Sequence, residues 1–223
     1  MEESLDVIQS AFQVRDNLCK KINFSKNPID LSIPHIPKPY KGNGKIKLII
    51  IGQDPTIRNK ESRPKVKTVL NLDKQDALEK YIKNEICGGL GIDPEEFYAT
   101  NLFKYFYSEP PKDTEFVLWA HLEPNLTLLK KEIAQYPNCP IITLGDPVFK
   151  LLSGNPKKRL NKLWGYQSKD KPSTGHFQME YIEHFGRYIY PLPHLPSWQK
   201  IAFYKNTLKD YLKFMKQNNP ILQ

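Results

Sequence analysis

The stretch IKLIIIGQDP at residues 46–55 joins an unbroken apolar run to a glycine and a turn. A short run of this kind, rich in β-branched residues, is typical of a strand buried on both faces in a parallel sheet. Gly52 lets the backbone turn sharply, and Pro55 fixes its own φ and restrains the residue before it. The stretch therefore predicts a central strand that holds the Asp54 carboxylate at the edge of a sheet.

Three further segments resemble strands, and helical stretches separate them. The predicted strands lie at 97–103, 141–144 and 188–192, and the predicted helices lie at about 73–87, 118–135, 146–153 and 198–216. Because strand and helix alternate, the chain is expected to form βαβ units. The predicted fold class is α/β, with three layers (α/β/α) around a central, mostly parallel sheet of four strands. In such sheets ligands bind beyond the carboxyl ends of the strands.

The first 45 residues differ in character from the rest of the chain. Apolar residues at helical spacing predict an amphipathic helix at about 3–22, and prolines at 28, 34, 37 and 39 predict a stiff loop after it. This lead-in is too short to fold alone, so it is expected to lie across the core at 46–216. Residues 1–223 are therefore predicted to form a single domain.

The charge of the chain favours a nucleic acid as partner. Basic residues outnumber acidic residues by 33 to 24, which gives a net charge of +9. A protein this basic attracts polyanions, and phosphate backbones are the commonest of them.

Three cysteines, Cys19, Cys87 and Cys139, lie far apart in the sequence. Zinc and iron–sulfur sites need ligands in closer groups, so no metal and no cofactor is expected. The sparse, odd set of cysteines also favours a reducing compartment, and no apolar run approaches the ~20 residues of a membrane helix. The protein is expected to be cytoplasmic and monomeric, with no contact with a membrane.

Asp54, Asn101 and His194 each lie at or just past the end of a predicted strand. Taken singly, they are better explained as two turn residues and a surface histidine. Together they place a carboxylate, an amide and an imidazole at one edge of one sheet, which favours a functional site.

The same segments resemble the motifs of a known family. Residues 52–55, GQDP, resemble the motif of family 1 uracil-DNA glycosylases in which the aspartate acts on the attacking water. Residues 98–103, YATNLF, are similar to the segment that carries the uracil-reading asparagine of the family, and residues 191–197, PLPHLPS, resemble the loop whose histidine meets the leaving base. Residues 139–145, CPIITLG, match a further layout of the superfamily. The four segments follow one another in the order of the family.

The chain departs from the family at several positions. The stretch after Asn101, with Pro110 and Pro111, resembles the iron–sulfur families 4 and 5, whose cluster cysteines lie near these prolines. Here that neighbourhood holds other residues instead, which predicts that the cluster is absent. They are Tyr105, Phe106, Tyr107 and His121.

Three differences bear on the substrate. Thr56 replaces a tyrosine that excludes the methyl group of thymine, and residues 68–71 lack the aromatic side chain on which the family stacks uracil. Another aromatic side chain nearby, or an aliphatic wall at Leu70, could take its place. Leu195 interrupts the H-P-S motif, so His194 could sit differently.

The resemblance implies a DNA glycosylase that hydrolyses the N-glycosidic bond of uracil or a related damaged base flipped out of DNA. It implies catalytic roles for Asp54 and His194 and base-binding roles for Gln53, Thr56, Leu70 and Asn101. DNA contacts are predicted in two basic loops and after the histidine loop. These residues are Arg58, Lys60, Arg63, Lys157, Lys158, Ser197 and Trp198, the last of which could equally pack the start of the final helix.

Two other functions remain open at this point. The missing tyrosine and aromatic side chain suggest a non-catalytic member of the same fold that binds nucleic acid or protein. A hydrolase for free nucleosides or another small molecule would leave the basic surface incidental.

Overall fold

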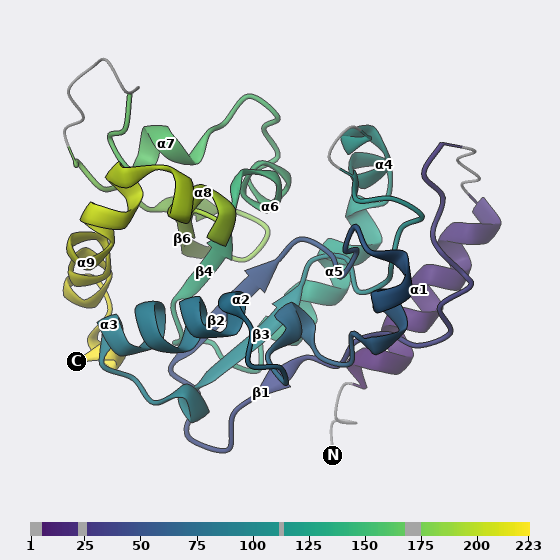
Figure 1. Ribbon diagram of the computed structural model, residues 1–223, viewed down its shortest axis with the longest axis horizontal. Coiled ribbons are helices and arrows are strands. Elements are labelled where there is room, and N and C mark those ends of the chain that lie inside the picture. The colour runs from purple at the N-terminus through teal and green to yellow at the C-terminus, as the bar shows by residue number, and fades with distance from the viewer. Residues whose placement is uncertain (1–5, 22–25, 112–113, 168–174) are drawn as a thin grey trace.

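A computed structural model describes residues 6–21, 26–111, 114–167 and 175–223. Its centre is a sheet of six strands in the order β1-β3-β2-β4-β6-β5 (Figure 1). The strands are β1 (Tyr40–Lys41), β2 (Leu48–Gly52), β3 (Phe97–Asn101), β4 (Ile141–Leu144), β5 (Glu180–Ile182) and β6 (Arg187–Leu192). The four inner strands, β3, β2, β4 and β6, are parallel to one another.

The α/β fold is confirmed, but the predicted number of strands was too small. The edge strands β1 and β5 pair in antiparallel fashion with β3 and β6. They have two and three residues, and the first lies in the proline-rich lead-in. Segments this short cannot show the alternating or continuous apolar pattern by which a strand is predicted. They lie in the sheet because a neighbouring strand forms hydrogen bonds with them.

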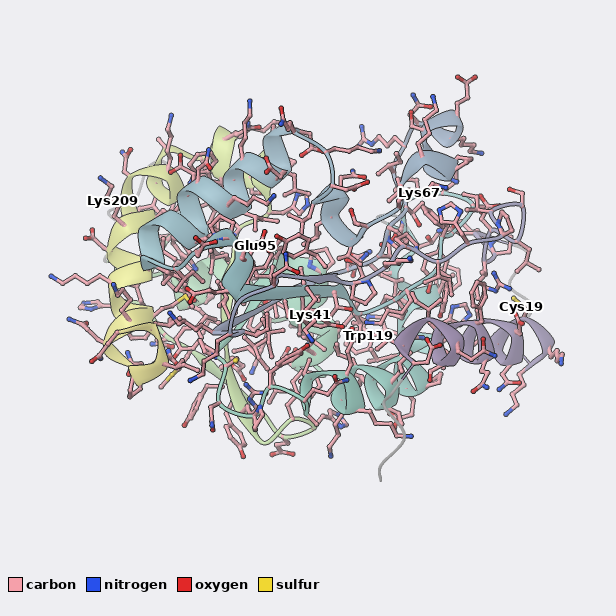
Figure 2. The ribbon with its side chains drawn as sticks, turned by 90° about the horizontal axis from the view of Figure 1, so that it is seen from below. Cys19, Lys41, Lys67, Glu95, Trp119 and Lys209 are labelled. Carbon is pink, nitrogen blue, oxygen red and sulfur yellow. The ribbon has the colours of Figure 1, made fainter. Side chains whose placement is uncertain are left out.

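Helices cover both faces of the sheet. In the side view of Figure 2 the helical stretch 77–90 lies on one face and α5 (Leu122–Ile133) on the other. α1 (Val7–Lys21) packs against α5, and α3 (Gly88–Leu90) packs against α9 (Ala202–Gln217). The remaining α-helices are α2 (Ala77–Lys80), α4 (Glu115–Ala120), α6 (Asp146–Leu152), α7 (Leu160–Leu163) and α8 (Leu195–Lys200). This arrangement confirms the three layers.

Two of the predicted helices are broken where the chain changes direction. The stretch 118–135 splits into α4 and α5 at His121, and the last helix splits into α8 and α9 at Ile201, whose backbone is extended. By contrast, the helix predicted at 73–87 is observed at 77–90 without a break, because α2, a π-helical segment η3 (Tyr81–Cys87) and α3 follow one another with right-handed helical backbone at each junction. Four short 3₁₀ segments complete the described elements: η1 (Lys60–Lys65), η2 (Val69–Asn71), η4 (Pro94–Glu96) and η6 (Pro220–Leu222).

The core surrounds the inner strands of the sheet. Every residue of β2 and β3 is buried, as expected for strands covered on both faces. Hydrogen bonds tie the lead-in to later segments of the chain: the Ser108 amide donates to the Pro28 carbonyl, and the Lys38 amide donates to the Lys67 carbonyl.

Candidate active site

The predicted polar residues lie at the carboxyl ends of neighbouring parallel strands. β2 and β3 end in register, with Gly52 opposite Asn101, and β4 and β6 end with Leu144 opposite Leu192. A cavity of about 540 Å³ lies at this edge. Six of the residues predicted for the site line it: Gln53, Asp54, Thr56, Leu70, His194 and Ser197. The other lining residues are Gly52, Pro110, Pro111, Glu115, Leu144, Gly145, Pro147 and Pro196.

Asn101 lies behind the wall of this cavity rather than on its surface. A Cβ atom added to Gly52 would meet the Asn101 Oδ1 atom at 2.4 Å and the Leu70 Cδ2 atom at 2.8 Å. Gly52, which lines the cavity, is therefore a glycine because its neighbours leave no room for a side chain. The Asn101 amide is buried, and its Oδ1 atom accepts no hydrogen bond within the part of the chain that the structure describes.

An unpaired buried oxygen costs about 1–3 kcal/mol. A ligand that donates a hydrogen bond to Asn101 would recover that free energy. The amide is thus suited to reading a polar edge of a bound molecule.

Asp54 is held by its own turn. The Thr56 amide donates to Oδ2 at 2.8 Å, and the Gln53 Nε2 atom donates to Oδ1 at 2.8 Å. Burial raises the pKa of the Asp54 carboxyl above its usual value, while the hydrogen bonds from Thr56 and Gln53 and the charge of Arg63 oppose that rise. The carboxylate is therefore held in one orientation and is poorly solvated, so its electrostatic attraction to a nearby positive charge is strong.

His194 immediately precedes α8, and its backbone is fixed from two sides. The Tyr81 hydroxyl donates to the carbonyl of Pro193 at 3.0 Å. Gly145, at φ +93°, approaches so closely that an added Cβ atom would lie 3.2 Å from the His194 Cβ atom. The His194 side chain faces the cavity, and loss of water there lowers the pKa of its imidazole. At neutral pH the ring is therefore uncharged and can donate one N–H.

Thr56 and Leu70 both line the cavity, the first with a polar side chain and the second with an apolar one. The Thr56 Oγ1 atom accepts a hydrogen bond from the Tyr107 amide at 2.8 Å, which ties the turn after Asp54 to the segment after β3. Leu70 adopts φ 57° and ψ 19°, a left-handed conformation that costs a non-glycine residue about 1–3 kcal/mol. The structure stores this strain beside the cavity.

The segment before Pro110 and Pro111, where the iron–sulfur families carry cluster cysteines, contributes packed aromatic side chains to the core. The rings of Tyr107 and His121 stack with centroids 5.8 Å apart, and the Tyr107 hydroxyl lies 3.1 Å from the His121 Nδ1 atom. The Asn125 Nδ2 atom donates to the Tyr105 hydroxyl at 2.9 Å, and burial lowers the pKa of His121 to about 4. Within the described ranges, no three His, Cys, Asp or Glu residues are grouped so as to hold a metal ion.

The predicted DNA-contacting residues divide into exposed and engaged groups. Arg58 and Lys157 are exposed. Lys60 forms an exposed ion pair with Glu109 at 2.5 Å, and Lys158 pairs with Glu180. The exposed Lys60–Glu109 pair contributes little to stability, so a phosphate group could replace its carboxylate.

Arg63 was wrongly predicted to contact phosphate. Its side chain is only 1% exposed, and its guanidinium donates to the carbonyls of Ile57, Tyr107 and Ser108. Asp30 lies 3.4 Å away as its ion-pair partner. Arg63 lies among exposed basic residues in the sequence, but its buried guanidinium links the loop after β2 to the segment after β3.

Trp198 packs against the core at the start of the final helical region, which is the second of the two roles that the sequence left open for it. Its ring lies 4.9 Å from the ring of Tyr81, centroid to centroid, at the junction of α8 and the core. Ser197 lines the cavity. The two adjacent residues thus face different surroundings, and contact of either with DNA stays a prediction.

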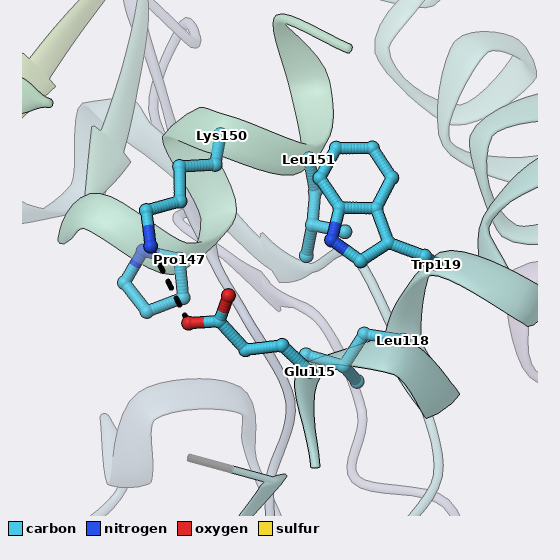
Figure 3. A pocket seen from close by; sticks show the side chains of 6 residues that line it. All are labelled: Glu115, Leu118, Trp119, Pro147, Lys150 and Leu151. Atoms are coloured by element: carbon cyan, nitrogen blue, oxygen red, sulfur yellow. Dashed lines mark hydrogen bonds and ion pairs between the residues drawn. The ribbon is translucent and has the colours of Figure 1, made fainter. Parts of the chain in front are cut away.

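Glu115 was missed by the sequence analysis. It begins α4 and lines the cavity, and its carboxylate lies 3.4 Å from the Lys150 Nζ atom on α6. Figure 3 shows the pair joining the two helices beside Pro147. No local pattern could have identified it, because the two partners are 35 residues apart.

The fold and this site together define an α/β protein with a cavity at the carboxyl edge of a parallel sheet. A family model of the uracil DNA glycosylase superfamily matches residues 39–217. The chain belongs to that superfamily, which confirms the resemblance and supports a glycosylase-type function with DNA as partner. A search of curated proteins found no match. Along the described stretches, no helix has the length and apolar character needed to cross a membrane.

Proposed function

We propose that the protein hydrolyses the N-glycosidic bond of uracil, or of a related damaged base, flipped out of DNA. The observation that carries this proposal is that Asp54 and His194 line one cavity at the ends of parallel strands, with the Asn101 amide buried directly behind its Gly52 wall. Each group has the chemical character that one part of the reaction requires.

Cleavage of the bond builds positive charge on the sugar and negative charge on the leaving base. The ionised Asp54 carboxylate would stabilise the sugar cation and orient the attacking water. The uncharged His194 imidazole would donate its N–H to the base oxygen on which negative charge develops. A preorganised group of either kind contributes ~2.7–4 kcal/mol to the stability of the transition state.

Asn101 would select the base. Its unpaired Oδ1 atom can accept the ring N–H of uracil, while its Nδ2 atom can donate to the adjacent carbonyl. Cytosine presents an acceptor and a donor in the reverse arrangement, so the buried amide would stay unpaired.

The test is release of uracil from single- and double-stranded oligonucleotides, measured by strand cleavage at the abasic product. Release by the wild type, absent from Asp54→Asn, supports the proposal. Salt-sensitive binding of DNA without release of any base would instead indicate a non-catalytic binder. Cleavage of free nucleosides without affinity for DNA would indicate the small-molecule hydrolase.

Thr56 is predicted to relax the selection at the C5 edge of the base. A methyl-sized space discriminates by only ~1–3 kcal/mol, so wild type should release uracil and 5-substituted uracils at comparable rates. Thr56→Tyr should slow release of the 5-substituted bases by roughly 10–200-fold while sparing uracil. Measurement of kcat/KM for both bases checks this.

Thr56→Ser is the matched control, because it keeps the hydroxyl that accepts from Tyr107. It should leave the ratio of the two rates unchanged. If wild type already excludes 5-substituted bases and Thr56→Tyr has no effect, Thr56 does not face that edge.

A further inference from the structure

A lysine with no predicted role lies directly beneath the strand end that carries Asn101. Lys104 is 3% exposed, and its Nζ atom donates to the Asn101 carbonyl at 2.6 Å, to Glu132 Oε2 at 2.5 Å and to the Thr100 hydroxyl. An ammonium group has three N–H donors, and here all three have partners. The lysine is therefore held in one direction.

Glu132, on the helix α5 that covers one face of the sheet, forms an ion pair with this lysine. It is fully buried, and its second carboxylate oxygen accepts from the Tyr98 hydroxyl at 2.5 Å. Burial lowers the pKa of the Lys104 ammonium, and the neighbouring Glu132 carboxylate opposes this change. The charged pair thus joins β3 to the helix behind it.

Stability gives no reason for a buried pair of this kind. Removal of two charges from water costs about as much as their attraction returns, so apolar side chains of similar volume are often equally stable. A charged, hydrogen-bonded pair differs from an apolar pair because its interactions are directional. Each hydrogen bond fixes the relative orientation of the two groups that it joins.

The peptide between Asn101 and Leu102 is held on both sides. Its carbonyl accepts from Lys104, and its amide donates to the Gly52 carbonyl at 2.9 Å. The next amide, of Phe103, donates to the Gln53 carbonyl at 2.9 Å. With this peptide plane fixed, the bond from the Asn101 backbone to its side chain has a fixed direction.

We propose that Lys104, oriented by Glu132, is a positioning residue that aims the Asn101 amide at the bound base. The inference rests on the proposed role of Asn101 in reading the base. Lys104 touches no substrate, so it acts on recognition only through Asn101.

The experiment replaces the pair with apolar residues of similar size, in Lys104→Met/Glu132→Leu. This variant should fold, but kcat/KM for release of uracil should fall by about tenfold to a hundredfold, because small displacements of a positioned group have effects of this size. In an Asn101→Ala background the same double substitution should change kcat/KM by less than about twofold. An equal loss in both backgrounds would overturn the proposal.

Tyr98→Phe is the matched control. It removes a hydrogen bond to Glu132 but none to Lys104 or Asn101. It should lower the melting temperature and leave kcat/KM within about twofold of wild type. A loss of kcat/KM equal to that of the double variant would show that general loosening, and not the Asn101 contact, is responsible.

A second readout does not depend on activity. The order parameter of the Asn101 side-chain amide, from ¹⁵N relaxation, should fall in Lys104→Met/Glu132→Leu and stay unchanged in Tyr98→Phe. If wild type releases no base, the proposed function fails, while this comparison still decides the positioning role. An unchanged order parameter overturns it.

Lys104→Gln/Glu132→Gln serves if the apolar pair does not fold. It keeps hydrogen-bonding groups at both positions but removes both charges, so the same measurements should change in the same direction.

Discussion

Asp54→Asn is expected to cut release of uracil by at least about a hundredfold while leaving the fold intact. The substitution keeps the size of the side chain and one of its oxygens, but removes the charge that faces the sugar cation. In wild type the Thr56 amide and the Gln53 side chain each donate to a different carboxylate oxygen. The asparagine oxygen can keep the hydrogen bond from Thr56, and the Gln53 amide can turn its own oxygen toward the new NH₂ group. Single-turnover kinetics on a uracil-containing duplex measure the effect.

The dependence on pH identifies the group responsible. Since burial raises the pKa of Asp54, activity should rise with pH through a value above the usual range for an aspartate. Asp54→Asn should lack this acid limb. Burial lowers the pKa of His194, so this ring also titrates on the acid side, and Asp54→Asn, which keeps His194, separates the two titrations.

Stability should change in the opposite direction. The folded protein binds the Asp54 proton more tightly than the unfolded chain does, so this group stabilises the fold at low pH. That contribution is lost as pH rises through the raised pKa. Asp54→Asn lacks this titration, so its stability should not fall over that pH range as the stability of wild type does, and thermal unfolding at several pH values checks this.

Asp210→Asn, at an exposed position on α9, is the matched control and should change neither activity nor its pH profile. Near wild-type activity of Asp54→Asn would show that Asp54 is only a turn residue.

Gly52→Ala is expected to reduce release of uracil by about a hundredfold without a change in secondary structure. The new methyl group would lie 2.4 Å from the Asn101 Oδ1 atom and 2.8 Å from the Leu70 Cδ2 atom, so both side chains must move. Overpacking of this kind costs about 1–3 kcal/mol of stability, and displacement of a positioned group by about 1 Å costs roughly a hundredfold in rate. Kinetics and thermal unfolding measure the two effects separately.

Gly88→Ala is the control for this substitution. Among the described residues, the nearest atom that its Cβ would meet is the Lys83 carbonyl oxygen, at an ordinary 3.9 Å. It should leave activity unchanged. Equal activity of Gly52→Ala and wild type would mean that the position of the Asn101 amide does not limit the reaction.

Local chemistry explains which parts of the fold could be predicted. The inner strands are largely apolar, and the predicted site residues lie at their ends: Asn101 is the last residue of β3, and Asp54 and His194 come two residues after β2 and β6. Parallel strands bring their carboxyl ends to one edge, so order along the chain was enough to group Asp54, Asn101 and His194. The edge strands β1 and β5 were missed because hydrogen bonds to a neighbouring strand, and not their own side chains, place them in the sheet.

The sequence by itself determined the class of fold, the family and the chemical groups that the strands deliver to the site. These follow from patterns within a few residues, which the backbone converts directly into strands, turns and helices. Only the tertiary structure decided that Arg63 is buried, that Trp198 packs on Tyr81, and that Asn101 rests on an ion pair between Lys104 and Glu132. Burial and pairing of charged side chains depend on residues far apart in the chain, so charge in a sequence does not reveal whether it meets solvent, DNA or another side chain.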